Sequence, residues 1–209
     1  MLWILIGIIL SYLIGSIPTA YIFGRLVKGI DIRKFGSGNV GATNALRVLG
    51  KGWGVAVFII DCLKGLIPVL FLASLLIQKN LPLSDVLLRI ILGMACVCGH
   101  NWTIFLKFKG GKGVATSLGF LLGLGFSVSG FIYVIILSIL AWVLVFAFLR
   151  IVSLASIIAS ILLPVLSIVL RQQPEIIALS FILAILSLIR HKSNISRLLK
   201  GQESSFKKS

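Results

Sequence analysis

Long apolar runs separated by short polar segments make up most of the chain. The runs cover residues 2–23, 53–77, 86–106, 114–149, 151–170 and 176–189. A helix needs about 20 mainly apolar residues to cross the hydrocarbon core of a bilayer, and most of these runs have that length. The pattern therefore predicts an all-α integral membrane protein whose spans are helices, some of them short or broken.

The run 114–149 is too long for a single span. At about 1.5 Å per residue, its 36 residues would form a helix of about 54 Å, against a hydrocarbon core of about 30 Å. We expect the chain to reverse near residues 127–130. This reversal raises the predicted number of transmembrane helices to about seven.

The lysines and arginines indicate how the spans are oriented. With seven spans and the N-terminus outside, sixteen of the 20 basic residues fall on one face and two, Lys79 and Arg171, on the other. Cytoplasmic loops carry the excess of basic residues. We therefore predict a single transmembrane domain over residues 1–209 with a cytoplasmic C-terminal segment and tail at 190–209. The polar, glycine-rich segments then all face the cytoplasm, at residues 34–52, 100–113, 152–156 and 190–203.

The amino-acid composition limits the class of protein, the kinds of binding site and the partners that are plausible. Hydrophobic residues make up 59% of the chain, which excludes a water-soluble domain, and the net charge is +15 with only five acidic residues. So few carboxylates argue against metal sites with oxygen ligands, and we expect neither a metal nor a cofactor. Because the basic residues lie between apolar runs, we expect membrane lipids and anionic substrates as partners, and no nucleic acid.

The segment GSGNVGATN at residues 36–44 has the composition of an anion-binding loop. Glycines allow successive backbone N–H groups to converge, and the helix predicted after the loop adds a partial positive charge. We expect its backbone and its small polar side chains to bind a phosphate, and Arg47 to add a bidentate contact. A flexible connector between spans is the alternative interpretation. The candidate ligands in the loop are Ser37, Gly38, Asn39, Gly41, Ala42, Thr43 and Asn44.

A second glycine-rich cationic turn, KFKGGKG, directly precedes another span. Lys112 lies between Gly111 and Gly113, where the first N–H groups of the next helix would also point, so we expect it to bind an anion. Lys107 and Lys109 are better explained as contacts with lipid headgroups. Two such turns on one face of the membrane predict two phosphate-bearing ligands.

The histidines and an intramembrane charge pair are further candidates. His191 and Asn194 are three residues apart, which places them on one helical face where they could position a hydroxyl group, although a single interfacial histidine is more often structural. Asp61 and Lys64 have the same spacing inside a span, and we interpret them as a structural ion pair.

Two serines begin the sixth predicted span. Either Ser153 or Ser156 could bind a ligand or could cap the helix, and the sequence leaves this choice open.

Three segments together resemble the motifs of a known family. GSGNVGATN with Arg47, then GHNWTIFLKFKGGKGVAT at residues 99–116, and RHKSNISRLLKGQE at 190–203 are similar in order and spacing to the motifs of the bacterial membrane glycerol-3-phosphate acyltransferases that use acyl phosphate, the PlsY family. DCLKG at residues 61–65 also resembles that family. Thr103 departs from it, because the family usually has proline there, and we expect only a local change in the loop.

The resemblance implies an activity. The protein would transfer a fatty acyl group from acyl phosphate to the 1-hydroxyl of sn-glycerol 3-phosphate, giving lysophosphatidate and phosphate. It would act at the cytoplasmic face of the bacterial inner membrane, supplied by a partner enzyme that makes acyl phosphate. A carrier or scramblase for an anionic lipid or phosphate ester is the alternative, but it should have polar residues on both faces of the membrane.

The resemblance also assigns residues to roles. The loop from Gly38 to Asn44 would bind the phosphate of the donor, and Glu203 would secure the C-terminal segment. The general base stays open between His191 and a phosphate oxygen of the substrate. The residues expected to hold glycerol 3-phosphate or to take part in catalysis are Ser37, Arg47, Lys112, His191, Asn194 and Ser156.

Overall fold

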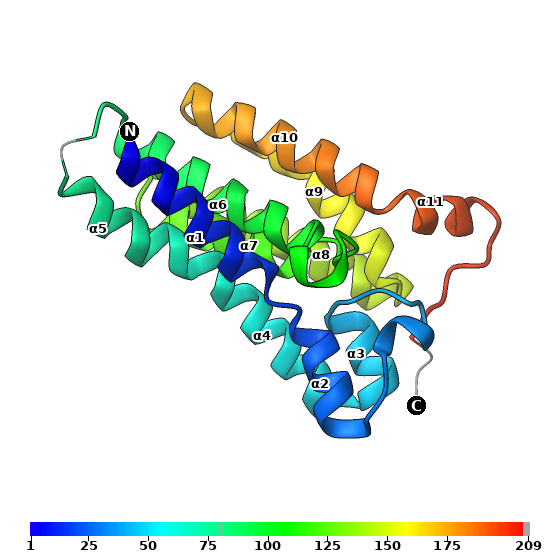
Figure 1. Ribbon diagram of the computed structural model, residues 1–209. Helices are drawn as coiled ribbons and strands as arrows, with labels where there is room; N and C mark the ends of the chain where they lie inside the picture. Colours follow the sequence, from blue (N-terminus) through cyan, green and yellow to red (C-terminus); the bar gives the residue numbers. More distant parts are fainter. Residues whose placement is uncertain (80, 207–209) are drawn as a thin grey trace. The chain divides into compact units, whose positions relative to one another are not determined.

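The computed structural model describes residues 1–79 and 81–206, and the chain divides into two compact units, Met1–Leu124 and Gly125–Ser209 (Figure 1). The described residues contain helices and no strands. Lys207 and Lys208 of the predicted basic tail lie outside the described residues. The prediction of one domain over residues 1–209 stays a prediction.

The first unit contains α-helices, two short 3₁₀ turns and one π-helical turn. They are α1 (Leu2–Ser16), α2 (Thr19–Lys28), η1 (Ile32–Lys34), α3 (Ala42–Leu49), α4 (Lys51–Ile67), the π-helical η2 (Pro68–Leu72), α5 (Ala73–Ile77), α6 (Asp85–Asn101), η3 (Ile104–Leu106) and α7 (Val114–Gly125). The second unit contains α8 (Phe131–Leu149), α9 (Val152–Val169), α10 (Pro174–Arg190) and α11 (Lys192–Leu199).

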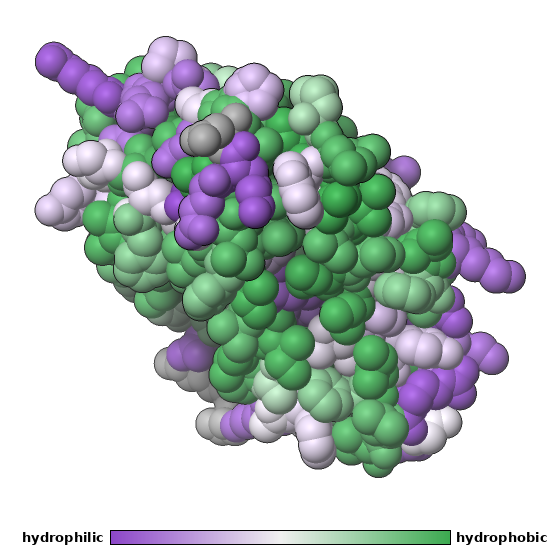
Figure 2. All heavy atoms as spheres, turned by 60° about the vertical axis from the view of Figure 1, so that its left-hand side comes forward, coloured by the Kyte–Doolittle hydropathy of each residue, from purple (hydrophilic) through white to green (hydrophobic). Residues whose placement is uncertain are grey.

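The helices have the length and surface of membrane spans. Within the described residues, five stretches are long and apolar enough to cross a bilayer, and the number is six if α10 and α11, bent by 62°, form one broken span. Large apolar side chains are exposed along them, and Figure 2 shows these hydrophobic residues over broad areas of the visible face. Such surfaces are stable against lipid tails and not against water. The prediction of an all-helical integral membrane protein is confirmed, whereas the count of seven spans and their orientation stay predictions.

The run 114–149 is interrupted at the predicted place, while the reversal of chain direction stays a prediction. Helix α7 ends at Gly125 and α8 begins at Phe131, after Gly130 in the left-handed conformation (φ 74°). The helix α7 is shorter than a typical span, as expected for one half of a divided run.

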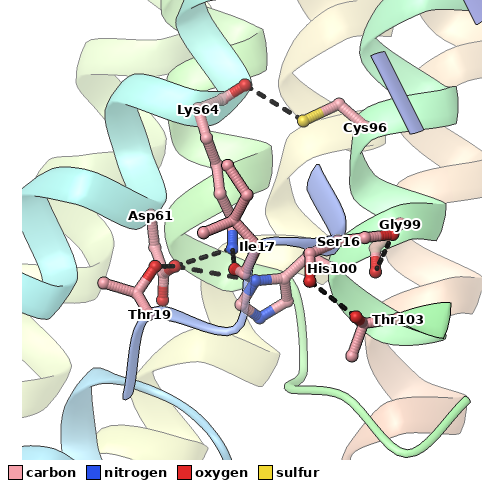
Figure 3. A network of polar contacts seen from close by, with 9 residues as sticks. All are labelled: Ser16, Ile17, Thr19, Asp61, Lys64, Cys96, Gly99, His100 and Thr103. Atoms are coloured by element: carbon pink, nitrogen blue, oxygen red, sulfur yellow. Dashed lines mark hydrogen bonds and ion pairs between the residues drawn. The ribbon is translucent and has the colours of Figure 1, made fainter. Parts of the chain in front are cut away.

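The first apolar run is broken at Ile17 and Pro18, between α1 and α2. Carbonyl groups freed by such a break need donors, because the membrane interior supplies no water. Two side chains from distant parts of the first unit provide them. The hydroxyl of Thr103 donates to the carbonyl of Ser16 at 2.5 Å, and the ammonium of Lys64 donates to that of Ile17 at 3.0 Å (Figure 3).

A second proline creates a similar requirement in α4. Pro68 has no N–H to offer the carbonyl of Lys64, four residues earlier. The thiol of Cys96 on α6 donates to that carbonyl at 3.0 Å, and Arg89 donates to the carbonyl of Val69 within η2. Cys96 is fully buried, as expected for a small core residue, and it also satisfies a backbone acceptor.

Close helix packing completes the first unit. Helix α1 lies along α6, and α3 and α2 pack against α4 (Figure 1). Gly15 of α1 lies against the backbone of Cys96, and Gly99 of α6 against that of Tyr12, so neither position has room for a Cβ atom. Small residues let two membrane helices approach to backbone contact, which fixes the end of α6 relative to the break after α1.

In the second unit, α9 packs against both α8 and α10. The hydroxyl groups of Ser167 and Ser180, both fully buried, share a hydrogen bond of 2.9 Å between α9 and α10. The polar segment after α10 contains α11 and leads to the backbone N–H of Phe206, which donates to the carbonyl of Arg150 at 2.9 Å. The C-terminal segment is thereby tied to the start of α9.

Candidate functional site: two glycine-rich turns and a C-terminal clasp

The first glycine-rich loop lies between η1 and α3, and Asn44 determines its shape. The side-chain oxygen of Asn44 accepts from the N–H of Ser37 at 2.9 Å. Its amide nitrogen donates to the carbonyls of Ile32 and Phe35, at 3.3 and 3.1 Å. The loop can close this tightly because Gly36 and Gly38 have positive φ angles, 59° and 70°.

These contacts revise one assignment made from the sequence. Asn44 is fully buried, and both N–H groups of its amide already donate to backbone carbonyls. A phosphate needs donors, so Asn44 shapes the loop and is not a direct ligand. Ser37 is exposed, Asn39 and Thr43 are partly exposed, and Arg47 is exposed on the last turn of α3.

An acidic residue precedes the loop. The Arg33 side chain, which donates to Asp31 at 2.7 Å, lowers the pKa of that carboxyl to about 2, against a smaller opposing effect of desolvation, and Arg25 lies 3.8 Å away. Asp31 is therefore a carboxylate paired with arginines, and its negative charge is compensated next to the loop.

The second glycine-rich turn is built on the C-terminal end of α6. The N–H groups of Gly110 and Gly111 donate to the carbonyls of Asn101 and His100, at 3.2 and 3.1 Å. Helix ends leave such carbonyls without intrahelical partners, and this turn satisfies two of them. Gly113 has a φ of 82°, and a Cβ atom there would lie 2.7 Å from the side-chain oxygen of Asn101. Alanine at this position would therefore be strained both by the backbone conformation and by a clash with Asn101.

The two turns touch each other within the first unit. A Cβ atom on Gly111 would lie 2.8 Å from the carbonyl oxygen of Val40, in the first loop. Val40 is itself buried in one cluster with Leu106, from the segment that leads into the second turn. Lys112 is half-buried and lies just before α7. The first N–H groups of α7 are at this N-terminal end of the helix, beside Lys112. The structure therefore brings together two candidate anion sites that are about 70 residues apart in the sequence.

The second unit contains a clasp around Glu203. One carboxylate oxygen accepts from the hydroxyl of Ser153 at 2.7 Å and from the amide of Asn194 at 2.6 Å, and the other accepts from Arg197 at 2.7 Å. The largest single influence on the pKa of Glu203 is desolvation, which raises it, but the three hydrogen bonds and the charge of Arg197 outweigh it and lower the pKa. The stabilisation that the clasp supplies is therefore present above the ordinary pKa of a glutamate and is lost as the pH falls through the lowered one.

The two serines of α9 are not helix caps. The N-cap position is Ile151, and no side chain caps this end. Ser153 donates to Glu203, and Ser156 donates to the carbonyl of Val152 at 2.8 Å while it accepts from Trp142 at 3.1 Å. The capping alternative is wrong, and both hydroxyl protons have acceptors within the unit, which argues against either serine as a phosphate donor.

His191 lies at the joint between α10 and α11 and is 2% exposed. Its Nδ1 atom is 2.9 Å from the carbonyl oxygen of Ser187. A carbonyl can only accept, so this shorter contact favours a proton on Nδ1, although the Ser187 hydroxyl also lies 3.4 Å from the same atom. With the proton on Nδ1, Nε2 of the neutral ring is an acceptor, as a base at that atom requires. Asn194, one turn further on, is held by Glu203.

Comparison with known proteins identifies the family. A family model described as glycerol-3-phosphate acyltransferase matches residues 5–201, which include both glycine-rich turns and the segment of His191 and Asn194. The chain belongs to this family. Glu203 lies just beyond the matched residues.

Curated relatives and solved structures agree with this membership. A glycerol-3-phosphate acyltransferase of Fusobacterium nucleatum is 48% identical over 201 residues, 96% of each chain. One from Prochlorococcus marinus is 44% identical and covers 95% of this chain and 92% of its own. The crystal structure of PlsY, an integral membrane glycerol 3-phosphate acyltransferase, in its glycerol 3-phosphate form is 40% identical with a TM-score of 0.84, covering 98% of this chain and 96% of that chain. The lysophosphatidic acid form of PlsY has a TM-score of 0.81, with 40% identity over 98% of this chain and 95% of its own.

Sequence reasoning missed several residues that shape these turns. Thr103, Asn101 and Thr19 make or face contacts that join segments far apart along the chain, and Cys96 donates to the carbonyl of Lys64 on another helix. The prolines at positions 18 and 68 were the available signal, because each one inside an apolar run leaves a carbonyl that some distant donor must satisfy.

Proposed function

We propose that the protein transfers a fatty acyl group from acyl phosphate to the 1-hydroxyl of sn-glycerol 3-phosphate, with lysophosphatidate and inorganic phosphate as products. The observation that carries this proposal is the contact between the two glycine-rich cationic turns at Val40 and Gly111. Both substrates carry a phosphate, and two adjacent anion sites fit a reaction between them. The PlsY structures with glycerol 3-phosphate and with lysophosphatidic acid support the acceptor and the product.

The first loop is the proposed site of the donor phosphate. Its backbone N–H groups from Asn39 to Thr43 and the start of α3 are the proposed donors and source of partial positive charge, since the N–H of Gly38 donates to the carbonyl of Phe35 within the loop. The buried side chain of Asn44 holds the loop in this shape through its hydrogen bonds with the backbone. The fatty chain of the donor would extend along the apolar surface of the helices, where lipid tails also lie.

The acceptor is proposed to bind through cationic and polar side chains. In the first unit, Ser37, Arg47 and Lys112 are the candidates for its phosphate and for the reacting carbonyl. In the second unit, His191 and Asn194 are the candidates for its glycerol hydroxyl groups. Positioning of this kind, with donors directed at the developing oxyanion, accounts for large rate enhancements without a strong base.

The simplest chemical step is direct attack. The 1-hydroxyl oxygen forms a bond to the acyl carbon, the bond from that carbon to the phosphate oxygen breaks, and phosphate leaves with the electron pair. The hydroxyl proton passes to Nε2 of His191 or to a phosphate oxygen of a substrate. No covalent acyl-enzyme is required, because acyl phosphate is already an activated mixed anhydride.

The proposed location is the cytoplasmic face of the bacterial inner membrane. The excess of basic residues in the loops with the glycine-rich turns supports this side. A partner enzyme that makes acyl phosphate would supply the donor. The carrier or scramblase alternative is less well supported, since the predicted outer face carries only short connectors.

Donor specificity tests the proposed function. We expect purified protein in liposomes to release lysophosphatidate when acyl phosphate and glycerol 3-phosphate are both present, and to release none from acyl-CoA or acyl carrier protein. The measurement is product formation by mass spectrometry with each donor alone. Transfer from acyl-CoA but not from acyl phosphate would contradict the assignment, and glycerol 3-phosphate flux without any donor would favour a carrier.

A further inference from the structure

A buried polar network lies beneath the two glycine-rich turns in the first unit, and acyl transfer as described above does not use it. Asp61 and Lys64 of α4 have side chains that are only 3% and 5% exposed, and their charged groups are 2.7 Å apart. Figure 3 shows Ile17, Thr19 of α2 and His100 of α6 around this pair. A small pocket is lined by Lys64 and His100 from this network and by Val40 and Gly111 from the two turns. The network therefore adjoins both candidate anion sites.

The pair contacts the break between α1 and α2. Asp61 accepts from the hydroxyl of Thr19, the first residue of α2, at 2.9 Å, while Lys64 donates to the carbonyl of Ile17 at 3.0 Å. The next residue of α2, Ala20, is buried in the same cluster as Val40 of the first loop. The pair thus fixes the start of the helix against which the first loop packs.

The pair also contacts the residue that supports the second turn. Nδ1 of His100 is 3.8 Å from the same Asp61 oxygen that binds Lys64 and Thr19 (Figure 3). The other ring nitrogen, Nε2, lies against Gly111 so closely that a Cβ atom at this position would collide with it. The backbone carbonyl of His100 accepts the N–H of Gly111 as well. The imidazole is therefore packed between the carboxylate and the turn that carries Lys112.

We infer that Asp61 and Lys64 are positioning residues for acyl transfer, which act through His100 on the turn that places Lys112 and through Thr19 on the helix beneath the first loop. This inference rests on the proposed function. It assigns His100 a supporting role and not a catalytic one, because its ring is covered by Gly111. A pair that served only to neutralise two charges in the membrane would need no contact with Thr19 or His100, which lead to the two turns.

The test uses a variant in which the pair is replaced without leaving a lone buried charge. Removing one partner alone would leave an uncompensated charge and could prevent folding. We expect the double variant Asp61→Asn with Lys64→Gln to fold, because asparagine keeps an acceptor for Thr19 and the glutamine amide keeps a donor for the carbonyl of Ile17. Its kcat/KM for glycerol 3-phosphate, per folded molecule, should fall about tenfold, as expected when a binding group is displaced and not removed.

A second readout is independent of catalysis. Amide hydrogen exchange at residues 110–113 should accelerate in the double variant, because the turn is held less firmly, while exchange in α8 and α9 stays unchanged. His100→Gln should give a similar loss of kcat/KM, and adding it to the double variant should cause little further loss, since the residues act in series.

The matched control is Ser180→Ala, which removes a buried hydrogen bond in the second unit without touching either turn. It should lower thermal stability and leave kcat/KM and the exchange of residues 110–113 unchanged. Unchanged kcat/KM and unchanged exchange at 110–113 in the Asp61/Lys64 double variant would overturn the inference and leave a purely structural pair. If wild-type protein transferred no acyl group from acyl phosphate, the proposed function would fail, and the exchange measurement would still decide whether the pair holds the turn.

Discussion

Replacing Lys112 with alanine is expected to lower kcat/KM for acyl transfer by about 10² to 10³-fold or more, with insertion and folding intact. Lys112 follows the glycines packed against Val40 and His100 and precedes the first turn of α7, so its ammonium can contact a phosphate or the carbonyl under attack. The measurement is phosphate release from palmitoyl phosphate and glycerol 3-phosphate by the purified variant, with size-exclusion chromatography in detergent as the check on folding.

Neighbouring lysines provide the control. Lys109 lies in the same turn, is exposed, and is expected to contact only lipid headgroups, so Lys109→Ala should keep near wild-type turnover. Arg47→Ala should resemble Lys112→Ala, and Lys51→Ala should resemble Lys109→Ala. Wild-type turnover in Lys112→Ala would remove this residue from the site.

Replacing His191 with alanine is expected to lower kcat by about 10²-fold or more, and His100→Ala by about tenfold. The hydrogen bond from Nδ1 of His191 to Ser187 presents Nε2 as an acceptor, whereas the ring of His100 is covered by Gly111. Steady-state kinetics of both variants at saturating donor give the ranking. The reverse ranking would mean that the roles of the two histidines are exchanged.

Much of the fold follows from the apolar pattern. The break between α7 and α8 was predictable because a helix of 36 residues is too long for a bilayer. The glycine-rich turns were recognisable from their composition, and their role as anion sites stays a prediction beside the alternative of a flexible connector. The location of Lys112 just before a helix followed from the onset of the next apolar run.

Other features depend on contacts that no local pattern reveals. Asn44 is a polar residue in a glycine-rich loop and was therefore predicted to be a ligand. Its amide instead makes hydrogen bonds with three backbone groups, those of Ser37, Ile32 and Phe35, and only the folded loop shows this. Thr103 was a departure from the family, and its hydroxyl satisfies a carbonyl 87 residues away. Ser153 had the position of a cap, but its hydroxyl donates a hydrogen bond to the carboxylate of Glu203, 50 residues later. In each case a long-range partner decides the role.

The most direct test of the central claim is the sidedness of the polar segments. In a background without native cysteines, single cysteines in place of Lys34, Lys200 and Lys79, all of them exposed, report on the first loop, the C-terminal segment and a connector on the opposite face. A membrane-impermeant thiol reagent added to right-side-out vesicles should label only position 79, and inside-out vesicles should be labelled at 34 and 200. Labelling of positions 34 and 200 from opposite sides would place two parts of the proposed machinery across the bilayer from each other and contradict the account.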